Sequence, residues 1–568
     1  MSSARIVRVV TDVAAVDKAF DYLVPEGLTL GVGDRVRVDL HGRSVRGWVV
    51  ATDVADEGRD LKPLKKWAGF GPPESLFPLA EWAAAHYVTP LSRALAAASC
   101  DRNITTLPAV PAKPIVESAV DYPSGVWELA PTTDPLDVVL SAYAATCRDR
   151  GSLLVMVPTE GWAERLTARL VARGLPTAYL NENWPAVRAG WPIVVATRNG
   201  CFAPAPSICG AVVFDADDEA FVSESSPTWE ATRIVAERCR IEALPLWLCS
   251  PLPSPSTRAL STAFHHGADA VGRWPHIVVI DRRSSDPRDG ALSQETLRLA
   301  DRVLNDGEDG VRVAIVLQRL GAGRLLACRQ CGELFRCAQC HEPESEDDGR
   351  VACNQHHDRR EPFCRSCGAT KPRAIRAGVT TLARDVGLQL GREVLEVTAS
   401  TSEIPVGTSV VVGTEAIFRL VRRSGIVVFV DFDQYLLGQR ERARRDAIYA
   451  VAKAGRLVGG RRDGRGQVVI QTRRGDDDVL RALENASFDE ISQSESATAQ
   501  LLGLPPFRAL AEIGGAKGDL YATALREAGV SVVRDGDRWL VQADTHEELR
   551  NALARAPRPS GAMRLAIR

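Results

Sequence analysis

The residues best suited to chemistry in this 568-residue chain are seven cysteines and one histidine between positions 328 and 367. They form four pairs in which two residues separate the partners: Cys328 with Cys331, Cys337 with Cys340, Cys353 with His356, and Cys364 with Cys367. The tight turn of such a pair points both side chains at one metal ion, and two pairs complete the tetrahedral shell of a structural zinc. We therefore expect two zinc ions per chain, each closed off from water by protein ligands.

The histidine of the third pair is the ligand for which the sequence offers alternatives. His356 has the required spacing, and imidazole replaces one thiolate in zinc sites built from three cysteines and a histidine. His357, which is adjacent, and His341, which follows Cys340, are the alternatives. Redox or packing roles for these cysteines are disfavoured, because the same spacing would have to recur four times by accident.

The other six cysteines are scattered along the chain: Cys100, Cys147, Cys201, Cys209, Cys239 and Cys249. The first residues do not resemble a signal peptide, and no apolar run approaches the roughly 18 residues that span a bilayer. We therefore expect a cytoplasmic protein without a membrane partner. In that reducing compartment the six cysteines are expected to be buried packing residues rather than disulfides.

The elements that must position these groups are of two kinds. Near the N-terminus, short strands are predicted at residues 5–10, 35–40 and 45–50, followed by a helix at 76–87 on which Trp82 and His86 are expected to face the core. From residue 136 onward, helices alternate with short Val/Ile/Leu runs, which indicates parallel sheets covered on both faces. A smaller α/β segment from about 487 to 568 ends with a helix at 520–528 and a hairpin around Asp535-Gly536.

Composition sets broad limits on function. The chain is 45% hydrophobic and 25% charged, as expected for a globular protein of several domains. Its net charge of −2 neither requires nor excludes nucleic acid, since local basic patches decide such binding. The stretch 440–474 is rich in arginine, and we consider both a solvated helix face and a phosphate-contacting stripe.

Several segments together resemble the primosomal protein PriA family (primosomal protein N′, replication restart protein). They are Phe20–Gly27 (FDYLVPEG) with Gly33–Val38 (GDRVRV), Val195–Pro204 (VATRNGCFAP), Val411–Glu415 (VVGTE), Ala454–Arg456 (AGR) and Leu504–Phe507 (LPPF). The cysteine-rich insertion within the second α/β lobe is similar to that family's zinc module. The resemblance is to a divergent, actinobacterial-type member without intact helicase motifs.

The resemblance implies how the metal ligands divide and where DNA binds. Cys328, Cys331, Cys364 and Cys367 would hold one zinc, and Cys337, Cys340, Cys353 and His356 the other. The family's N-terminal domain binds the 3′ end of the nascent leading strand. By that resemblance Phe20, Asp21, Tyr22, Gly42 and Lys62 form a pocket for the terminal nucleotide, although Phe20 and Tyr22 are also compatible with packing inside a small barrel.

Two ATPase motifs of the family are missing. A P-loop requires G-x4-G-K-[ST], whose glycines and lysine hold the phosphates. The stretch 134–151, where we expect it, has no lysine and no glycine before Gly151. The family's D-E-E-H box reads Asp215-Ala216-Asp217-Asp218. We therefore predict no nucleotide-binding residues and no catalytic residues.

The resemblance implies an α/β multidomain fold. Its expected parts are an N-terminal β-rich 3′-end DNA-binding domain (1–104), a linker (105–133) with the winged helix reduced or absent, degenerate RecA-like helicase lobes (134–300 and 301–486) with the two-zinc insertion 328–367, and a C-terminal domain (487–568). The expected function is binding of abandoned or stalled forks and reloading of the replicative helicase, without ATPase activity. Expected partners are forked or branched DNA, the replicative helicase with its loading proteins, and single-stranded-DNA-binding protein. The alternative is an ATP-dependent 3′-to-5′ DNA helicase with an unconventional nucleotide site.

Overall fold

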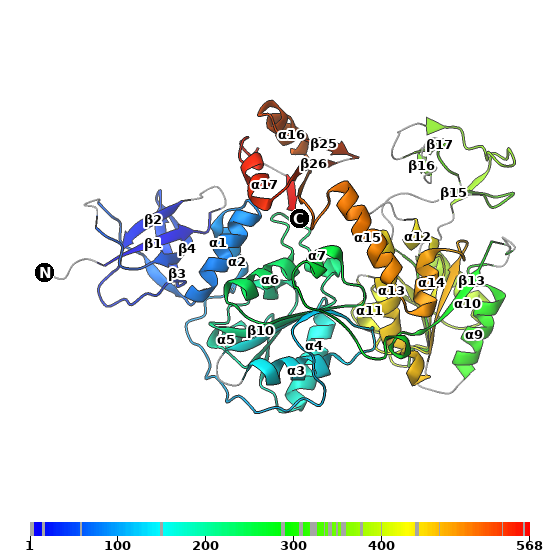
Figure 1. The fold of residues 1–568 in the computed structure, drawn as a ribbon, viewed down its shortest axis with the longest axis horizontal. Helices are drawn as coiled ribbons and strands as arrows, with labels where there is room; N and C mark the ends of the chain where they lie inside the picture. Colours follow the sequence, from blue (N-terminus) through cyan, green and yellow to red (C-terminus); the bar gives the residue numbers. More distant parts are fainter. Residues whose placement is uncertain are drawn as a thin grey trace. The chain divides into compact units, whose positions relative to one another are not determined.

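The computed structural model describes residues 5–13, 18–56, 60–147, 151–283, 285, 290–305, 310–318, 326–333, 335–338, 344–347, 350–353, 359–374, 379–398, 400–437, 442–464, 466–536, 538–559 and 563–568. The chain divides into two compact units (Figure 1). Unit 1 contains Met1–Leu129, Asp134–His266 and Ser492–Arg568, and unit 2 contains Ala130–Thr133 and Gly267–Ile491.

Unit 1 begins with a five-stranded antiparallel sheet in the order β2-β1-β4-β3-β5. Its strands are β1 (Ile6–Thr11), β2 (Ala19–Leu23), β3 (Arg35–Leu40), β4 (Arg43–Ala51) and β5 (Lys66–Gly69). Successive side chains of a strand point to opposite faces, so Val36 and Val38 lie in the core with Val9, whereas Arg37 faces away. The strands predicted at 5–10, 35–40 and 45–50 are confirmed, and β2 and β5 are not among those that the sequence predicts.

Helices α1 (Phe77–His86) and α2 (Leu91–Ala97) follow a short 3-10 turn, η1 (Glu74–Leu76). Pro78 stands in the first turn of α1, where its missing N–H is not needed. The segment before the helix passes close to the sheet, because a Cβ on Gly33 (φ +93°) would lie 1.9 Å from the carbonyl oxygen of Pro72. Only glycine allows this approach, which places the predicted helix against the strands.

The middle of unit 1 is a seven-stranded parallel sheet in the order β12-β6-β11-β10-β7-β9-β8. The strands are β6 (Gly125–Glu128), β7 (Ser152–Met156), β8 (Thr177–Tyr179), β9 (Ile193–Ala196), β10 (Ile208–Phe214), β11 (Leu246–Ser250) and β12 (Phe264–His266). The helices are α3 (Pro135–Thr146), α4 (Glu160–Ala172), α5 (Trp184–Ala189), α6 (Ala231–Ile241) and α7 (Pro255–Arg258), with 3-10 turns η2 (Arg198–Phe202) and η3 (Glu219–Phe221). Every residue of β7, β9 and β10 is buried, as expected for a sheet covered on both faces.

Strand β6 corrects the predicted linker at 105–133. It lies between β11 and β12 in the first lobe's sheet, so the lobe begins before residue 134. The strand is only four residues long and follows Pro123, and for this reason it shows no apolar run that a sequence pattern could reveal. Residues 105–124, all of them described, form neither helix nor strand.

The expectation that all six scattered cysteines are unpaired is wrong for two of them. Cys147, directly after α3, and Cys209, in β10, form a disulfide in the structure, with their Cα atoms 5.9 Å apart. Both side chains are buried in the core beneath α3. Cys201, Cys239 and Cys249 are buried free cysteines, as predicted.

The last segment of the chain completes unit 1. Its antiparallel sheet has the order β25-β26-β24-β27, with β24 (Ala509–Gly514), β25 (Val533–Asp535), β26 (Arg538–Ala543) and β27 (Arg564–Ile567). Helices α16 (Gly518–Glu527) and α17 (His546–Leu553) accompany it, and α15 (Asp489–Leu502) precedes it. The predicted helix and hairpin are confirmed. Thr228 of the first lobe donates a hydrogen bond to the Leu565 carbonyl at 2.9 Å, which ties this segment to the lobe.

Unit 2 is built on a six-stranded parallel sheet in the order β13-β23-β22-β14-β21-β20. The strands are β13 (His276–Asp281), β14 (Val313–Val316), β20 (Leu395–Val397), β21 (Val410–Gly413), β22 (Ile426–Phe429) and β23 (Gln467–Thr472). The helices are α8 (Ala270–Arg273), α9 (Gln294–Asn305), α10 (Val379–Leu390), α11 (Ile417–Leu420), α12 (Asp433–Leu436), α13 (Ala443–Val458) and α14 (Asp478–Asn485), with the turn η4 (Arg461–Asp463). Because β13 pairs with β23, it belongs to this second sheet and not to the first lobe, to which the predicted boundary at residue 300 assigns it.

A small module is inserted between β14 and α10. It contains β15 (Leu326–Cys328) paired with β19 (Pro372–Ala374), and β16 (Ser345–Asp347), β17 (Arg350–Ala352) and β18 (Arg359–Arg360). The predicted α/β multidomain fold class is thereby confirmed: an N-terminal β-rich domain, two α/β lobes built on parallel sheets, a cysteine-rich insertion and a small C-terminal α/β domain. Among the described helices, none is both long and apolar enough to cross a membrane.

Candidate metal centre and DNA-binding domain

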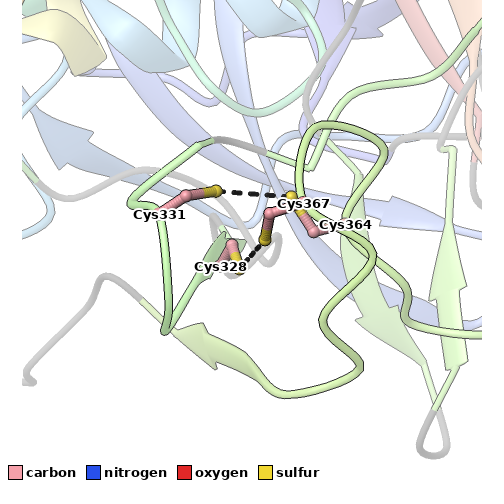
Figure 2. Close-up of side chains that lie close together, drawn as sticks. All are labelled: Cys328, Cys331, Cys364 and Cys367. Atoms are coloured by element: carbon pink, nitrogen blue, oxygen red, sulfur yellow. Dashed lines mark hydrogen bonds between the residues drawn. The ribbon is translucent and has the colours of Figure 1, made fainter.

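Four cysteines of the insertion meet at one point (Figure 2). The Sγ atoms of Cys328, Cys331, Cys364 and Cys367 all lie within 4.8 Å of one another. The Cys328–Cys367 and Cys331–Cys364 sulfur pairs are 3.5 Å apart. Four sulfurs bound to one zinc at about 2.3 Å stand roughly 3.8 Å apart, so this donor set fits a tetrahedral zinc site with four thiolate ligands.

The two halves of this centre have the same backbone. Cys328 and Cys364 each accept, at the carbonyl oxygen, a hydrogen bond from the glycine four residues later, Gly332 at 3.0 Å and Gly368 at 2.8 Å. Both glycines are in the left-handed region, with φ of +76° and +74°. Sequence reasoning selected the cysteines but missed these glycines, although the repeated pattern C-x2-C-G marks them. Each glycine closes the turn that directs its cysteine pair inward.

The electrostatics of the cluster favour a bound cation. Burial alone would raise the pKa of the Cys328 thiol, but backbone N–H groups of Cys331 and Gln330 and the neighbouring thiols lower it to about 7. At Cys331 a backbone N–H from Glu333 favours the thiolate, but the Cys367 side chain, burial and the other thiols raise its pKa to about 12. Without a cation, four thiols at this separation cannot ionise together.

The second predicted zinc site is only partly described. Cys337 and Cys353 are buried in the insertion, with 6% and 1% of their surface exposed. Cys340 and His356 lie outside the described residues, as do the alternative ligands His341 and His357. Within the described part of the chain, the first set is the only group of three or more candidate ligands that meets. The second zinc site therefore stays a prediction.

The predicted DNA pocket is divided between two faces of the N-terminal sheet. Val9 pairs with Phe20 and Val7 with Tyr22, so both aromatic rings pack into the core that these valines share. Asp21 points to the opposite face, where it accepts hydrogen bonds from its cross-strand neighbour Arg8 at 2.8 and 3.3 Å. The three residues of this motif therefore do not converge on one point.

Gly42 and Lys62 meet at a residue that the sequence motifs did not mark out. The Asp39 carboxylate accepts hydrogen bonds from Lys62 Nζ at 2.8 Å and from the backbone N–H of Gly42 at 3.1 Å, and the hydroxyl of Tyr22 donates to the Asp39 carbonyl at 3.0 Å. The bond from Lys62, with those from Gly42 and Lys65, lowers the pKa of Asp39 to about 2. An acid three residues before a turn glycine is the sequence signal that could have identified Asp39.

The loop between β6 and α3 differs in sequence from a phosphate-binding P-loop. In an open α/β sheet ligands bind at the carboxyl ends of strands, and phosphates bind at a following helix N-terminus. Here the loop reads Leu129–Asp134 (LAPTTD), without glycine or lysine. Asp134 caps α3 with a hydrogen bond from the Leu136 N–H at 3.0 Å, and Pro135 removes a donor from the first turn.

The Asp134 carboxylate thus caps the N-terminus of α3, the kind of position at which phosphates bind in other proteins. Asp134 also accepts two hydrogen bonds from Arg169, at 2.9 and 2.6 Å. Burial would raise the pKa of Asp134, but the bonds from Arg169 and Leu136 and the nearby arginine charges lower it. The group is therefore ionised at neutral pH, and its charge is paired with the Arg169 guanidinium.

The acidic motif after β10 is used within the fold. Asp217 accepts hydrogen bonds from Thr257 Oγ1 at 2.6 Å, Ser250 Oγ at 3.0 Å and the backbone N–H of Ser254 at 3.2 Å. Asp218 caps η3 through the Ala220 N–H at 2.9 Å. Two of the three acids in Asp215–Asp218 therefore fasten loops of the lobe.

The arginine-rich stretch 440–474 does not form a continuous free stripe in its described part. Arg445 is buried, Arg461 donates to backbone carbonyls, and Arg444, Lys453, Arg462 and Arg474 pair with acids. Arg440 and Arg465 lie outside the described residues. Most of these charges therefore serve the second lobe itself.

Two histidines far apart in the sequence meet inside unit 1. The ring of His86, from α1, lies 4.4 Å from that of His546, from α17, and 4.6 Å from that of Trp82. Arg233, from α6, places Nη1 3.5 Å from His546 Nε2. His86 Nε2 and His546 Nδ1 are buried without a hydrogen-bond partner among the described residues. The prediction that Trp82 and His86 face the core is confirmed, because both pack at this junction.

We expect this junction to weaken in mild acid. Burial, with the charges of His546, Arg233 and Arg550, lowers the pKa of His86 to about 2, and burial with Arg233 lowers that of His546 to about 4. Because both values lie below the unfolded pKa of about 6.5, the stabilisation is present above pH 6.5 and is lost progressively as the pH falls toward 4. The measurement is urea unfolding followed between pH 7.5 and 4.5, with an expected loss of about 1–2 kcal/mol.

A matched variant isolates this effect from acid release of zinc. His546→Gln removes one titrating ring and should flatten the pH dependence, whereas His276→Gln, at an exposed position of the second lobe, should leave it unchanged. A His546→Gln variant with the same pH dependence as the wild type would contradict the assignment.

Comparison with known proteins identifies the N-terminal domain. Residues 8–99 match the family described as the 3′DNA-binding domain (3′BD) of PriA. The chain is 22% identical over 429 residues to replication restart protein PriA of Thermotoga maritima, covering 67% of this chain and 55% of that protein. It is 24% identical over 442 residues to the Haemophilus influenzae protein of the same name, covering 67% and 57%.

The chain thus spans little more than half the length of these relatives. A solved structure of the Escherichia coli DEAH/RHA helicase HrpB is 13% identical, covering 62% of this chain and 40% of that chain, and its TM-score of 0.31 is too low to carry weight. The domain match and the sequence relatives agree with each other and with the described fold. This chain is therefore similar to the PriA replication restart proteins over two thirds of its length, and its residues 8–99 match their 3′DNA-binding domain.

Proposed function

We propose that this protein binds abandoned or stalled replication forks in the cytoplasm, at the nucleoid, and takes part in replication restart without ATPase or helicase activity of its own. The observation that carries the proposal is the match of residues 8–99 to the 3′DNA-binding domain. The relatives named replication restart protein support the same process.

The proposal gives the two α/β lobes a structural role. The β6–α3 loop lacks the glycines and lysine of a phosphate-binding loop. Asp134 also caps the N-terminus of α3, where a phosphate would otherwise accept hydrogen bonds from the backbone N–H groups. The buried strands of both sheets need no nucleotide to pack. The lobes then act as a scaffold that carries the DNA-binding, zinc and C-terminal modules.

In this proposal the partners are forked DNA, the replicative helicase with its loading proteins, and single-stranded-DNA-binding protein, and primosome assembly is the outcome. Two zinc ions stabilise the insertion, one held by Cys328, Cys331, Cys364 and Cys367 and the other by Cys337, Cys340, Cys353 and His356. Zinc supplies rigidity there rather than chemistry, since four protein ligands leave no open position.

We also propose that the 3′ end of the nascent strand binds at the predicted pocket residues. Asp21 would accept the free 3′-hydroxyl, and Lys62 and the backbone at Gly42 would lie beside the terminal nucleotide. Phe20 and Tyr22, which pack in the sheet core, would hold β2 in place beneath Asp21.

The test compares forks that end in a 3′-hydroxyl with forks that end in a 3′-phosphate. We expect the phosphate to weaken binding about tenfold, because a carboxylate repels the added charge. Fluorescence anisotropy with labelled forks measures both affinities. Asp21→Asn should reduce the difference between the two ends, whereas Asp53→Asn, at an exposed turn of the same domain, should not. Equal affinity of the wild type for both ends would overturn the pocket.

A further inference from the structure

Three cations stand in register across the N-terminal sheet. Arg37 of β3 pairs directly with Arg46 of β4 on one side and with Lys66 of β5 on the other. Directly paired residues of neighbouring strands share one face of a sheet, with Cβ atoms about 5 Å apart. The side chains of Lys66, Arg37 and Arg46 therefore form one row, which we call the cationic row.

The cationic row is hardly neutralised within the fold. Arg46 has one ion pair, with Asp12 at 3.4 Å, and 44% of its side chain is exposed. No hydrogen bond or ion pair joins the Arg37 or Lys66 side chain to another residue of the described chain. Lys62 and Lys65, by contrast, both pair with Asp39.

A fourth cation lies beneath this face. Arg35, two residues before Arg37 on the same strand, is 3% exposed and donates to the carbonyls of Cys100 and Arg102. Burial and then the charge of Arg46 lower the pKa of Arg35. The face therefore carries a concentration of positive charge that the described part of the domain compensates only in part, through the ion pair of Arg46 with Asp12.

Such a row is unfavourable for folding, since like charges directly opposite one another on a sheet are destabilising. A polyanion laid across the row would remove the repulsion and release its own counterions. A protein partner would need apolar anchors. No large apolar side chain among the described residues from 5 to 99 is exposed, so the face offers none.

We propose that Arg37, Arg46 and Lys66 bind the phosphodiester backbone of DNA, at a site separate from the pocket for the 3′ end. This inference rests on the proposed DNA-binding function, but it assigns a different contact. Binding by the cationic row does not depend on the base sequence of the DNA or on the chemical group at its end. It adds affinity for any duplex or strand that leaves the pocket across this face.

The experiment uses the full chain and an Arg37→Gln/Lys66→Gln variant. Binding of a labelled fork is measured by anisotropy between 50 and 300 mM NaCl. We expect the variant to bind the fork about tenfold more weakly than the wild type at 50 mM NaCl. The slope of log K against log salt should be smaller for the variant by about 0.9 for each duplex phosphate that it no longer neutralises, or about 1.8 in total.

The variant should keep the wild-type preference for a 3′-hydroxyl over a 3′-phosphate. The melting temperature should be equal or higher, since the repulsion is relieved.

Arg93→Gln, which removes an exposed cation on α2 of the same domain, is the matched control and should keep the wild-type salt slope. A double variant with wild-type affinity and slope overturns the cationic row but leaves the proposed function standing. A wild-type protein that does not bind forks overturns the proposed function itself. If the double variant binds DNA normally but loses binding to a polyglutamate peptide, the row serves an acidic protein segment and the inference is wrong.

Discussion

Cys328→Ser is expected to release one zinc ion per chain and to unfold the insertion between β14 and α10. The four sulfurs lie within 4.8 Å of one another, so the loss of one leaves an incomplete shell. Binding of structural zinc can supply roughly 10–16 kcal/mol of apparent free energy to a small module, far more than its few buried apolar residues can replace. Elemental analysis of fresh protein measures the zinc content, and limited proteolysis reports the unfolding.

The wild type should contain two zinc ions, and Cys337→Ser should release the other one. Cys100→Ser, which changes a half-buried free cysteine in unit 1, is the control and should retain both. A wild-type content below about 1.5 zinc ions per chain would count against the second site. If the Cys328→Ser protein keeps its full zinc content, the assignment of the first zinc site is wrong.

The second large effect is an expected absence of ATP hydrolysis. Phosphoryl transfer depends on positioning and on electrostatic stabilisation of the phosphates, and removing such groups typically lowers the rate by orders of magnitude. Here Asp134 caps α3, and Asp217 is engaged by Ser250, Ser254 and Thr257. We expect turnover at least about 10³-fold below the roughly 10 s⁻¹ of a typical enzyme, and no strand separation.

A coupled ATPase assay with forked DNA checks this, together with a strand-displacement assay. Asp215→Ala, at the one position of the acidic motif that keeps the family's residue, should change neither result. If the wild type hydrolyses ATP above background and Asp215→Ala abolishes that activity, the protein is an ATP-dependent 3′-to-5′ helicase with an unconventional nucleotide site. Unchanged fork binding by Asp215→Ala would show that the variant is folded.

The parts of the fold that could be predicted from the sequence are those with local signals. The Val/Ile/Leu runs of β9, β14 and β22 are buried on both faces, and such strands leave a continuous apolar pattern. The spacing within the pairs Cys328–Cys331 and Cys364–Cys367 predicts metal binding. That these two pairs, more than thirty residues apart, meet at one site is what the family resemblance implies, and the structure brings them together.

The parts that could not be predicted depend on partners distant in the chain. Strand β6 has only four residues and is recognisable only through β11 and β12, which lie more than 100 residues later. The junction of His86 and His546 joins helices 460 positions apart, and no local pattern marks it. Gly42 and Lys62 both donate hydrogen bonds to the Asp39 carboxylate, because the hairpin turn places Gly42 there and the segment before β5 places Lys62 there.

The division of the chain has a consequence for its synthesis. Ser492–Arg568 belongs to unit 1, whereas Gly267–Ile491, which is translated earlier, belongs to unit 2. Apart from the four-residue segment Ala130–Thr133, unit 2 is one continuous stretch of chain. Domains form as their residues leave the ribosome, so unit 2 can fold while translation continues. Unit 1 must wait for β24 and β27, and the apolar surface around Thr228 stays uncovered until then. Nascent chains stalled between residues 491 and 564 should therefore be the ones that chaperones retain.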